Sequence, residues 1–341
     1  MTRLLVPLDG SAFGETALPL AAAVAERRGS KLELVTVLAS PSDPDVAATV
    51  TAGIEAEMRT RAQTYLEGLA ERVQRQFDID VGVTALDGEI ASAIAAHAMA
   101  DPPELIVMST HGRTGPSRFI LGSVADRLIR QLHCPFILVH PATPSANGEL
   151  PAAARVLVPL DGSRSAESVL DEVARLFSAS LVTLHLVRVV APAEVVPMAA
   201  PMALPAIVPG QIEARLASAR EYLERTASKL RKTGWHVKQE VLTEWMPSTG
   251  VHTYAIAHEC DLIAIATRGL GGVQRMLLGS VADRVIRDSA TPVLVVNPEP
   301  GAFSRLLSAE PESVADTASM GSCVLHDTGN ATLACDLGVL R

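Results

Sequence analysis

The chain has few aromatic residues, no excess of positive charge and few cysteines, and each shortage excludes a class of protein. Aromatic residues make up 3% of its 341 residues and hydrophobic residues 48%, so the cores must be aliphatic. The formal net charge of -9 argues against nucleic acid as a partner, because phosphate backbones require a basic surface. The four cysteines form no C-x-x-C pair, which argues against a zinc knuckle or a thioredoxin-type site.

The sequence also lacks the segments typical of secreted and membrane proteins. Its first residues contain no signal-peptide core or cleavage site. One long apolar stretch, residues 189–210, contains five prolines, and each would cost a helix interior about 3 kcal/mol. We therefore predict a proline-rich loop there, no membrane partner and a cytoplasmic location.

Signatures of common nucleotide-dependent and hydrolytic enzymes are missing as well. The chain contains no P-loop G-x-x-x-x-G-K-[S/T], no G-x-S-x-G elbow, no H-E-x-x-H and no protein-kinase signature. Phosphoryl transfer depends on positioned charge and metal, and no general base is evident beside the glycine loops described below. No catalytic residue is predicted, and hydrolysis, if any, should be slow.

What the sequence does contain is a tandem repeat. Residues Thr2–Ser11 match Ala154–Ser163 at eight of ten positions, and Leu121–Val139 match Leu278–Val296 at eleven of nineteen. This spacing far exceeds the repeat length of a solenoid, so each copy should be a whole domain. We predict a first domain at 1–141, a linker at 142–153, a second domain at 154–298 and a disordered tail at 299–341.

Strand and helix patterns alternate in both domains, which predicts parallel sheets built from βαβ units. Strands are expected at 3–8, 31–38, 80–86, 104–108 and 135–139, and again at 155–160, 181–189, 235–242, 261–266 and 292–296. Helices are expected at 12–28, 54–76, 89–100 and 123–131, and again at 166–179, 211–232, 247–259 and 280–288. The predicted fold class is therefore α/β, with two tandem doubly wound (flavodoxin/Rossmann-like) domains of five parallel strands.

Each domain carries a glycine loop between its fourth strand and the following helix. Backbone amides in such a loop, together with a helix N-terminus, can bind an anion such as phosphate. The alternatives are a plain turn glycine and an ordinary helix N-cap. The positions concerned are Ser109, Gly112, Gly122 and Ser123 in one domain, and Ala266, Gly269, Gly279 and Ser280 in the other.

An Asp-Gly-Ser triplet follows the first strand of each domain, at Asp9 and at Asp161. In open α/β sheets, ligands bind at the carboxyl ends of the strands where the strand order reverses. If the first and fourth strands are neighbours, the aspartate and the glycine loop face one crevice, where the carboxylate suits a ribose hydroxyl or a metal ion. The alternative is that each aspartate only caps the helix that follows.

These two motifs together resemble the universal stress protein family, whose ATP-binding members show G-x2-G-x9-G-[S/T] after the fourth strand. The resemblance covers residues 1–141 and 154–298, although Ser109 and Ala266 stand in place of the first glycine, where a positive φ would be strained. It implies ATP or another adenine nucleotide in each domain, with Mg or Mn bridging the phosphates. The implied binding residues are Pro7, Asp9, Ser109, Gly112, Arg113, Gly122 and Ser123, and Pro159, Asp161, Ala266, Gly269, Gly279 and Ser280.

The resemblance further implies a regulatory stress-response protein whose loops change order with nucleotide occupancy and so control binding of a protein partner. It implies that the two domains pair as a pseudo-dimer within the chain. Two such chains could further form a homodimer. Two alternatives remain open at this point: a nucleotide-free interaction or scaffold protein of the same fold, and a slow ATPase.

Overall fold

The computed structural model describes residues 2–38, 52–110, 121–140, 153–192, 211–267 and 278–298, together with Leu307. All of these residues belong to one unit, residues 1–309, within which ten strands form one sheet. The predicted linker, most of the proline-rich stretch and most of the tail lie outside the described residues.

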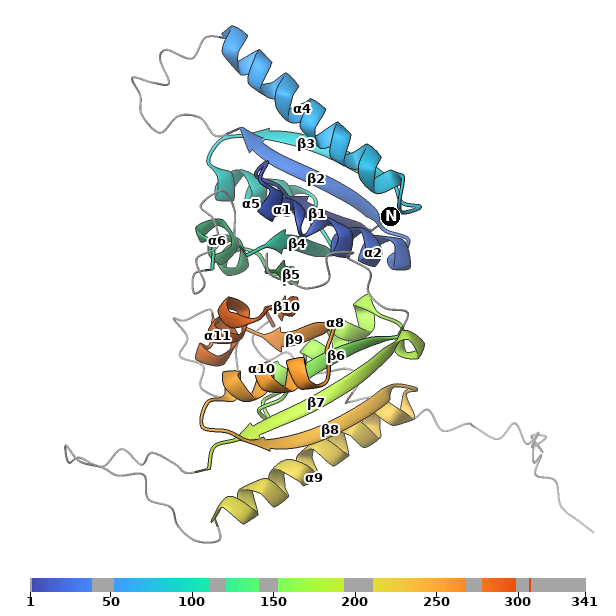
Figure 1. The fold of residues 1–341 in the computed structure, drawn as a ribbon, viewed down its shortest axis with the longest axis vertical. Coiled ribbons are helices and arrows are strands. Elements are labelled where there is room, and N and C mark those ends of the chain that lie inside the picture. The colour runs from blue at the N-terminus through green and yellow to red at the C-terminus, as the bar shows by residue number, and fades with distance from the viewer. Residues whose placement is uncertain are drawn as a thin grey trace, which may run out of the picture. The chain divides into compact units, whose positions relative to one another are not determined.

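The first half of the sheet has the strand order β3-β2-β1-β4-β5, and all its neighbouring strands are parallel (Figure 1). Its strands are β1 (Arg3–Pro7), β2 (Lys31–Leu38), β3 (Val81–Asp87), β4 (Leu105–Ser109) and β5 (Phe136–Val139). Its helices are α1 (Ala12–Glu15), α2 (Leu18–Arg28), α4 (Ala52–Gln74), α5 (Ile90–Ala100) and α6 (Ser123–Gln131). The alternation predicted from the sequence is confirmed.

The second half repeats this arrangement as β8-β7-β6-β9-β10, again with parallel neighbours. Its strands are β6 (Ala154–Pro159), β7 (Val182–Val190), β8 (His236–Thr243), β9 (Leu262–Ala266) and β10 (Val293–Val296). Its helices are α7 (Arg164–Glu167), α8 (Val169–Leu176), the 3-10 turn η1 (Ala179–Leu181), α9 (Gln211–Lys232), α10 (Pro247–Ala257) and α11 (Ser280–Asp288).

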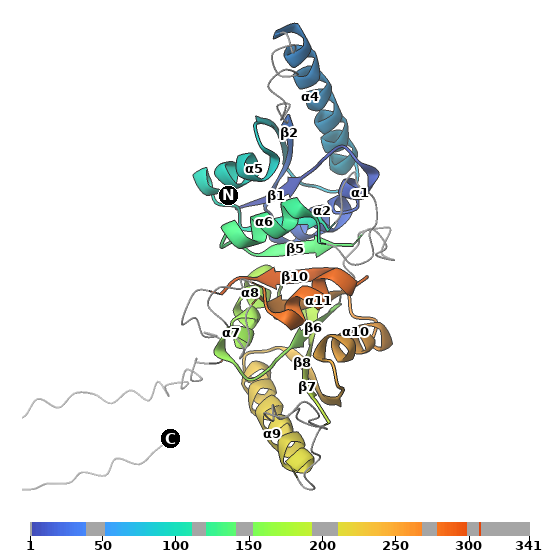
Figure 2. The ribbon, with the colours of Figure 1, turned by 90° about the vertical axis from the view of Figure 1, so that its left-hand side faces the viewer.

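Helices cover both faces of the sheet, as expected for strands that are apolar throughout. Helices α2, α4, α8 and α9 contribute to one buried apolar cluster, and α5, α6, α10 and α11 contribute to the other. Figure 2 shows α6 beside β5 and α11 beside β10, where the two halves meet. The chain is therefore a doubly wound α/β protein.

The two halves join where β5 pairs with β10 in antiparallel orientation, with Ile137 opposite Leu294. Both strands are short, and all four residues of each are buried. Because each edge strand satisfies the backbone hydrogen bonds of the other, the two five-stranded sheets become one continuous sheet. The antiparallel pairing agrees with the pseudo-dimer implied by the resemblance.

An ion-pair network also links the two halves. The side chain of Glu104, only 4% exposed, accepts hydrogen bonds from Arg28 of its own half and from Arg175 of α8, whose Nη1 lies 2.7 Å from Oε1. Arg175 also donates to the Glu104 carbonyl oxygen at 2.8 Å and pairs with Glu172. A buried carboxylate at the beginning of β4 is thus shared by guanidinium groups from both halves.

One expectation was wrong in detail. The single helix predicted over 12–28 is two helices, α1 and α2, and the helix predicted over 166–179 is divided into α7 and α8 at Ser168. At each break a hydroxyl bonds the carbonyl three residues earlier, from Thr16 to Phe13 at 2.6 Å and from Ser168 to Ser165 at 2.7 Å. Such side-chain bonds compete with the helical backbone, and α2 additionally begins with a proline in its first turn.

Candidate functional site

The candidate site lies where the strand order of each half reverses. Strand β1 lies between β2 and β4, and β6 lies between β7 and β9, so the first and fourth strands of each half are indeed neighbours. Leu4 is aligned with Leu105, which places Asp9 just beyond the carboxyl end of β1 and Ser109 at the carboxyl end of the adjacent β4. The alignment of Val156 with Leu262 does the same for Asp161 and Ala266. This is the crevice in which doubly wound folds bind ligands.

A tight turn holds the Asp9 carboxylate at this edge. Its Oδ1 accepts hydrogen bonds from the backbone N–H of Ser11 at 3.0 Å and from the Ser11 hydroxyl at 2.6 Å. Gly10 has a φ of 80°, which favours glycine. The N-cap of α1 is Ser11, whose Oγ accepts from Gly14 N at 3.0 Å. Capping thus belongs to the serine, and the aspartate orients the turn from outside the helix.

The turn of the second half has the same construction. Asp161 Oδ1 accepts from Ser163 N at 2.8 Å, Ser163 Oγ accepts from Ala166 N at 3.1 Å, and Gly162 has a φ of 89°. Pro7 and Pro159 are the last residues of β1 and β6 and precede these turns. The four predicted residues therefore occupy equivalent positions in the two halves.

Gly122 and Gly279 lie against the backbone at the ends of β4 and β9. The N–H of Gly122 donates to the Thr110 carbonyl at 2.9 Å, and the N–H of Gly279 donates to the Thr267 carbonyl at 2.6 Å. A Cβ at Gly122 would lie 2.9 Å from the Thr110 oxygen, and one at Gly279 would lie 3.2 Å from the Thr267 oxygen. Their φ values of -55° and -70° are ordinary, so close approach, not a left-handed backbone, requires glycine here.

These two backbone hydrogen bonds fix the start of α6 at Ser123 and of α11 at Ser280, as predicted from the sequence. Neither helix has a side-chain cap hydrogen bond from its N-cap residue. Helix N-termini with uncapped amides attract anions. The loop end in each half thus offers backbone donors beside the aspartate turn.

The expected strain at Ser109 and Ala266 does not arise. Both are buried final residues of strands, and Glu259 is the only non-glycine residue with positive φ in the described part of the chain. The small side chains at these positions are therefore compatible with the backbone found there. Gly112, Arg113 and Gly269 lie outside the described residues.

The two halves differ next to their glycine helices. Arg127 of α6 pairs with Glu89, the N-cap residue of α5, at 2.8 Å. Both side chains are exposed, so this is a surface ion pair. Hydrogen bonding to Ser92, together with the nearby guanidinium, lowers the pKa of Glu89. In the second half the arginine equivalent to Arg127, Arg284, donates instead to the Met246 sulfur at 3.8 Å. Because Met246 stands where the first half has Glu89, the region around Arg284 carries one negative charge fewer than the region around Arg127.

Sequence reasoning missed a cluster behind each aspartate turn. Tyr65 donates to Glu15 at 3.1 Å in the first half, and Tyr222 donates to Glu167 at 2.8 Å in the second. Burial, and then the neighbouring carboxylate, raises the pKa of both phenols above the usual range. The second cluster also contains Arg188, and a single arginine in the otherwise apolar end of β7 was the available signal.

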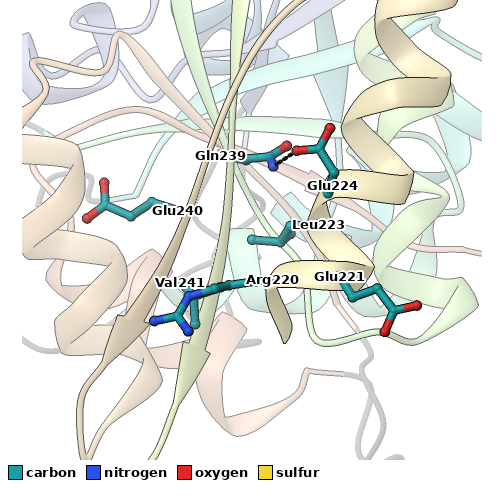
Figure 3. A pocket seen from close by; sticks show the side chains of 7 residues that line it. All are labelled: Arg220, Glu221, Leu223, Glu224, Gln239, Glu240 and Val241. Atoms are coloured by element: carbon teal, nitrogen blue, oxygen red, sulfur yellow. Dashed lines mark hydrogen bonds between the residues drawn. The ribbon is translucent and has the colours of Figure 1, made fainter. Parts of the chain in front are cut away.

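Two further polar features of the described residues lie away from the crevice. A cavity of about 500 Å³ between α9 and β8 is lined by acidic and amide side chains, and Figure 3 shows Glu224 and Gln239 pointing toward one another there. With three glutamates and one arginine, its lining repels a polyanion. In the second half, His185 is 1% exposed and its Nδ1 lies 3.1 Å from the Tyr254 hydroxyl. Neither feature belongs to the crevice.

Two properties of the described residues bear on the predicted partners. None of their helices combines the length and the apolar character that a bilayer-spanning segment needs. No group of three or more His, Cys, Asp or Glu side chains among them is placed to hold a metal ion. A divalent cation at this edge would need ligands beyond the described side chains, and the phosphates of a nucleotide can supply them.

Comparison with known proteins gives the same picture for both halves. The model of the Universal stress protein family matches residues 1–140 and 153–297. Universal stress protein Rv2623 of Mycobacterium tuberculosis is 27% identical over 302 residues, which cover 86% of this chain and 95% of that protein.

Among solved structures, a universal stress protein from Archaeoglobus fulgidus shares the fold with a TM-score of 0.60. It is 21% identical, and the match covers 86% of this chain and 98% of that one. A universal stress protein solved in complex with cAMP matches 41% of this chain, with 21% identity and a TM-score of 0.31. The nucleotide is that protein's ligand.

Proposed function

Since this chain belongs to the universal stress protein family, we propose that it is a regulatory stress-response protein that binds an adenine nucleotide at each of two similar sites. ATP is the first ligand to test. The observation that carries the proposal is that one arrangement occurs in each half. An aspartate turn follows one strand, and at the end of the adjacent strand a glycine N–H bonds the backbone just before a helix begins. A single copy of either feature would be an ordinary turn or helix start.

In this proposal the carboxylates of Asp9 and Asp161 accept hydrogen bonds from ribose hydroxyls. The backbone amides at the helix starts, from Ser123 in α6 and from Ser280 in α11, bind the phosphates, while Gly122 and Gly279 hold these starts against the strand ends. Pro7, Ser109, Pro159 and Ala266 line the crevice, and the family motif adds Gly112, Arg113 and Gly269. Mg or Mn, when bound, neutralises phosphate charge, with the phosphates as its main ligands.

The proposed role is regulatory and not catalytic. The residues proposed for each crevice are one carboxylate, small residues and backbone amides, which suit binding more than proton transfer. Nucleotide occupancy would order the glycine loops and so alter the surface offered to a protein partner. The predicted division into domains at 1–141 and 154–298 and the cytoplasmic location, where ATP is available, form part of this proposal.

The test is the number of nucleotides bound, measured by isothermal titration calorimetry with ATP and Mg. The parent protein should bind two. Gly122→Val and Gly279→Val should each bind one, because a β-branched side chain collides with the Thr110 or Thr267 carbonyl and displaces the helix amides. Gly68→Val is the matched control, since a Cβ at Gly68 meets nothing within 4 Å.

The outcomes separate the alternatives. No saturable binding by the folded parent protein would refute the nucleotide proposal and favour a nucleotide-free scaffold. Two nucleotides bound by both single variants would show that the sites lie elsewhere. Phosphate release that disappears in the Asp9→Ala, Asp161→Ala double variant would identify a slow ATPase.

A further inference from the structure

Arg188 places a guanidinium group beside the aspartate turn of the second half. It lies near the carboxyl end of β7, and a Cβ at Gly162 would be 3.3 Å from its Nη1 and 3.5 Å from its Nη2. Its Cζ lies 5.1 Å from the centroid of the Tyr222 ring, a cation–π distance. The ring fixes the position of the guanidinium group next to the residue that follows Asp161.

No carboxylate within the described part of the chain forms an ion pair with Arg188. Two acidic side chains belong to this cluster, and one of them, Glu167, accepts a hydrogen bond from the Tyr222 hydroxyl at 2.8 Å. The other is Asp161, whose Oδ1 accepts from Ser163 N. Arg188 therefore offers a positioned fork of N–H donors whose charge has no carboxylate partner among the residues that the structure describes.

The first half has no such cation at the equivalent place. Leu4 pairs with Leu32 and Val156 pairs with Leu184, so Arg188 corresponds to Thr36. The Thr36 hydroxyl donates to the Leu8 carbonyl at 2.8 Å. The arginine of the first cluster, Arg72, comes from helix α4 and pairs with Glu15. Within the described segments, the second crevice thus has a guanidinium group without a carboxylate partner next to its aspartate, and the first crevice does not.

We propose that Arg188 makes the second site selective for adenine nucleotides that carry a further phosphate on the 2′- or 3′-hydroxyl of the ribose, while the first site lacks this selectivity. The inference rests on the proposed function, because it takes the ribose to lie at Asp161. A guanidinium fork suits a phosphate group, and in doubly wound folds an arginine beside the ribose accommodates a ribose phosphate. Arg188 also offsets the repulsion that the Asp161 carboxylate would exert on a second phosphate.

The test compares three probes at one site at a time by isothermal titration calorimetry. The Gly122→Val background leaves the second site and Gly279→Val leaves the first. The probes are AMP, adenosine 2′,5′-bisphosphate and adenosine 3′,5′-bisphosphate, so the last two identify which hydroxyl carries the recognised phosphate. One bisphosphate should bind the second site about tenfold more tightly than AMP, the gain of one charge-assisted hydrogen bond.

Variants assign that preference to the side chain. Arg188→Thr should remove the preference and leave AMP affinity unchanged, whereas Thr36→Arg should introduce it at the first site. Arg225→Thr is the control, because Arg225 is an exposed arginine of the same half that pairs with Glu221 on its own helix.

Equal affinity of the second site for AMP and both bisphosphates would overturn the inference while leaving the proposed function intact. Equal losses for all three probes in Arg188→Thr would also overturn it, since the side chain would then support the turn and not the ribose phosphate. If neither ATP nor AMP binds at all, both proposals fail.

Discussion

Removing the Glu104 carboxylate should show how much the ion-pair network between the halves contributes to the stability of the protein. The side chain is 4% exposed and pairs with Arg28 and Arg175, which are 28% and 39% exposed. Glu104→Ala leaves two guanidinium groups close to one another without their shared anion. We expect both halves to become less stable in the same measurement, because the arginines come from both.

The magnitude follows from the geometry. Opposite unit charges about 4 Å apart attract by about 4 kcal/mol at an effective dielectric constant of about 20, and removing one partner of a buried pair costs about 3–5 kcal/mol. Both arginines keep some access to water, and Arg175 keeps Glu172, so the cost should be smaller. We expect Glu104→Ala to lower the free energy of unfolding by about 2–3 kcal/mol and Glu104→Gln, which keeps the shape, by about 1 kcal/mol.

Urea denaturation followed by circular dichroism measures these differences. The control is Glu57→Ala, because Glu57 pairs with Arg61 across an exposed helix turn, with side chains 63% and 78% exposed, and should cost less than about 0.5 kcal/mol. A double-mutant cycle of Glu104→Ala with Arg175→Ala should give a coupling energy above about 1 kcal/mol. If Glu104→Ala is no more harmful than Glu57→Ala, the buried network does not hold the halves together.

Two further predictions concern buried titratable groups. Burial, aided by Lys238, His258 and Arg155, lowers the pKa of His185 from 6.5 to about 4. The unfolded chain therefore binds this proton more tightly, and the stability that His185 contributes at pH 7 is lost as pH falls from about 6.5 toward 4. The loss should be about 2 kcal/mol at pH 5, and urea denaturation should show less acid sensitivity in His185→Phe; equal losses in both proteins would contradict this. Burial also raises the pKa of Cys134 to about 12 and of Cys260 to about 11. In the Cys323→Ser, Cys335→Ser variant, a thiol reagent at pH 8 should label no cysteine in the native protein and two in urea, and rapid native labelling would show that these thiols are accessible.

The sequence predicts regular elements best where a hydrophobic period is bounded by a clear signal. The apolar strand at Lys31–Leu38 and the helices at 123–131, 211–232 and 280–288 have the predicted bounds. Glycine at Gly122 and at Gly279 marks a helix start in both copies. Repetition adds to the strength of each pattern, because a turn that occurs once is common and one that recurs in register is not.

Features that depend on distant residues could not be predicted in this way. The break between α1 and α2 involves the Thr16 hydroxyl and a proline in the first turn of α2, although the helical pattern continues on both sides. The requirement for glycine at Gly122 comes from the carbonyl of Thr110, twelve residues earlier. Arg188 and Tyr222 come from different elements, and only the fold brings them to the aspartate turn. The predicted roles of the crevice residues stay predictions until ligand binding is measured.

The network around Glu104 makes the junction between the halves one-sided. In a symmetric dimer of identical subunits every contact would occur twice, as a matched pair about the symmetry axis. Here the counterpart of Glu104, Asp261, bonds Arg155 of its own half, and the counterpart of Arg175 is Ala23. The two halves are thus complementary and not interchangeable. If the chain were separated between them, each fragment would have more to gain from the other than from a second copy of itself.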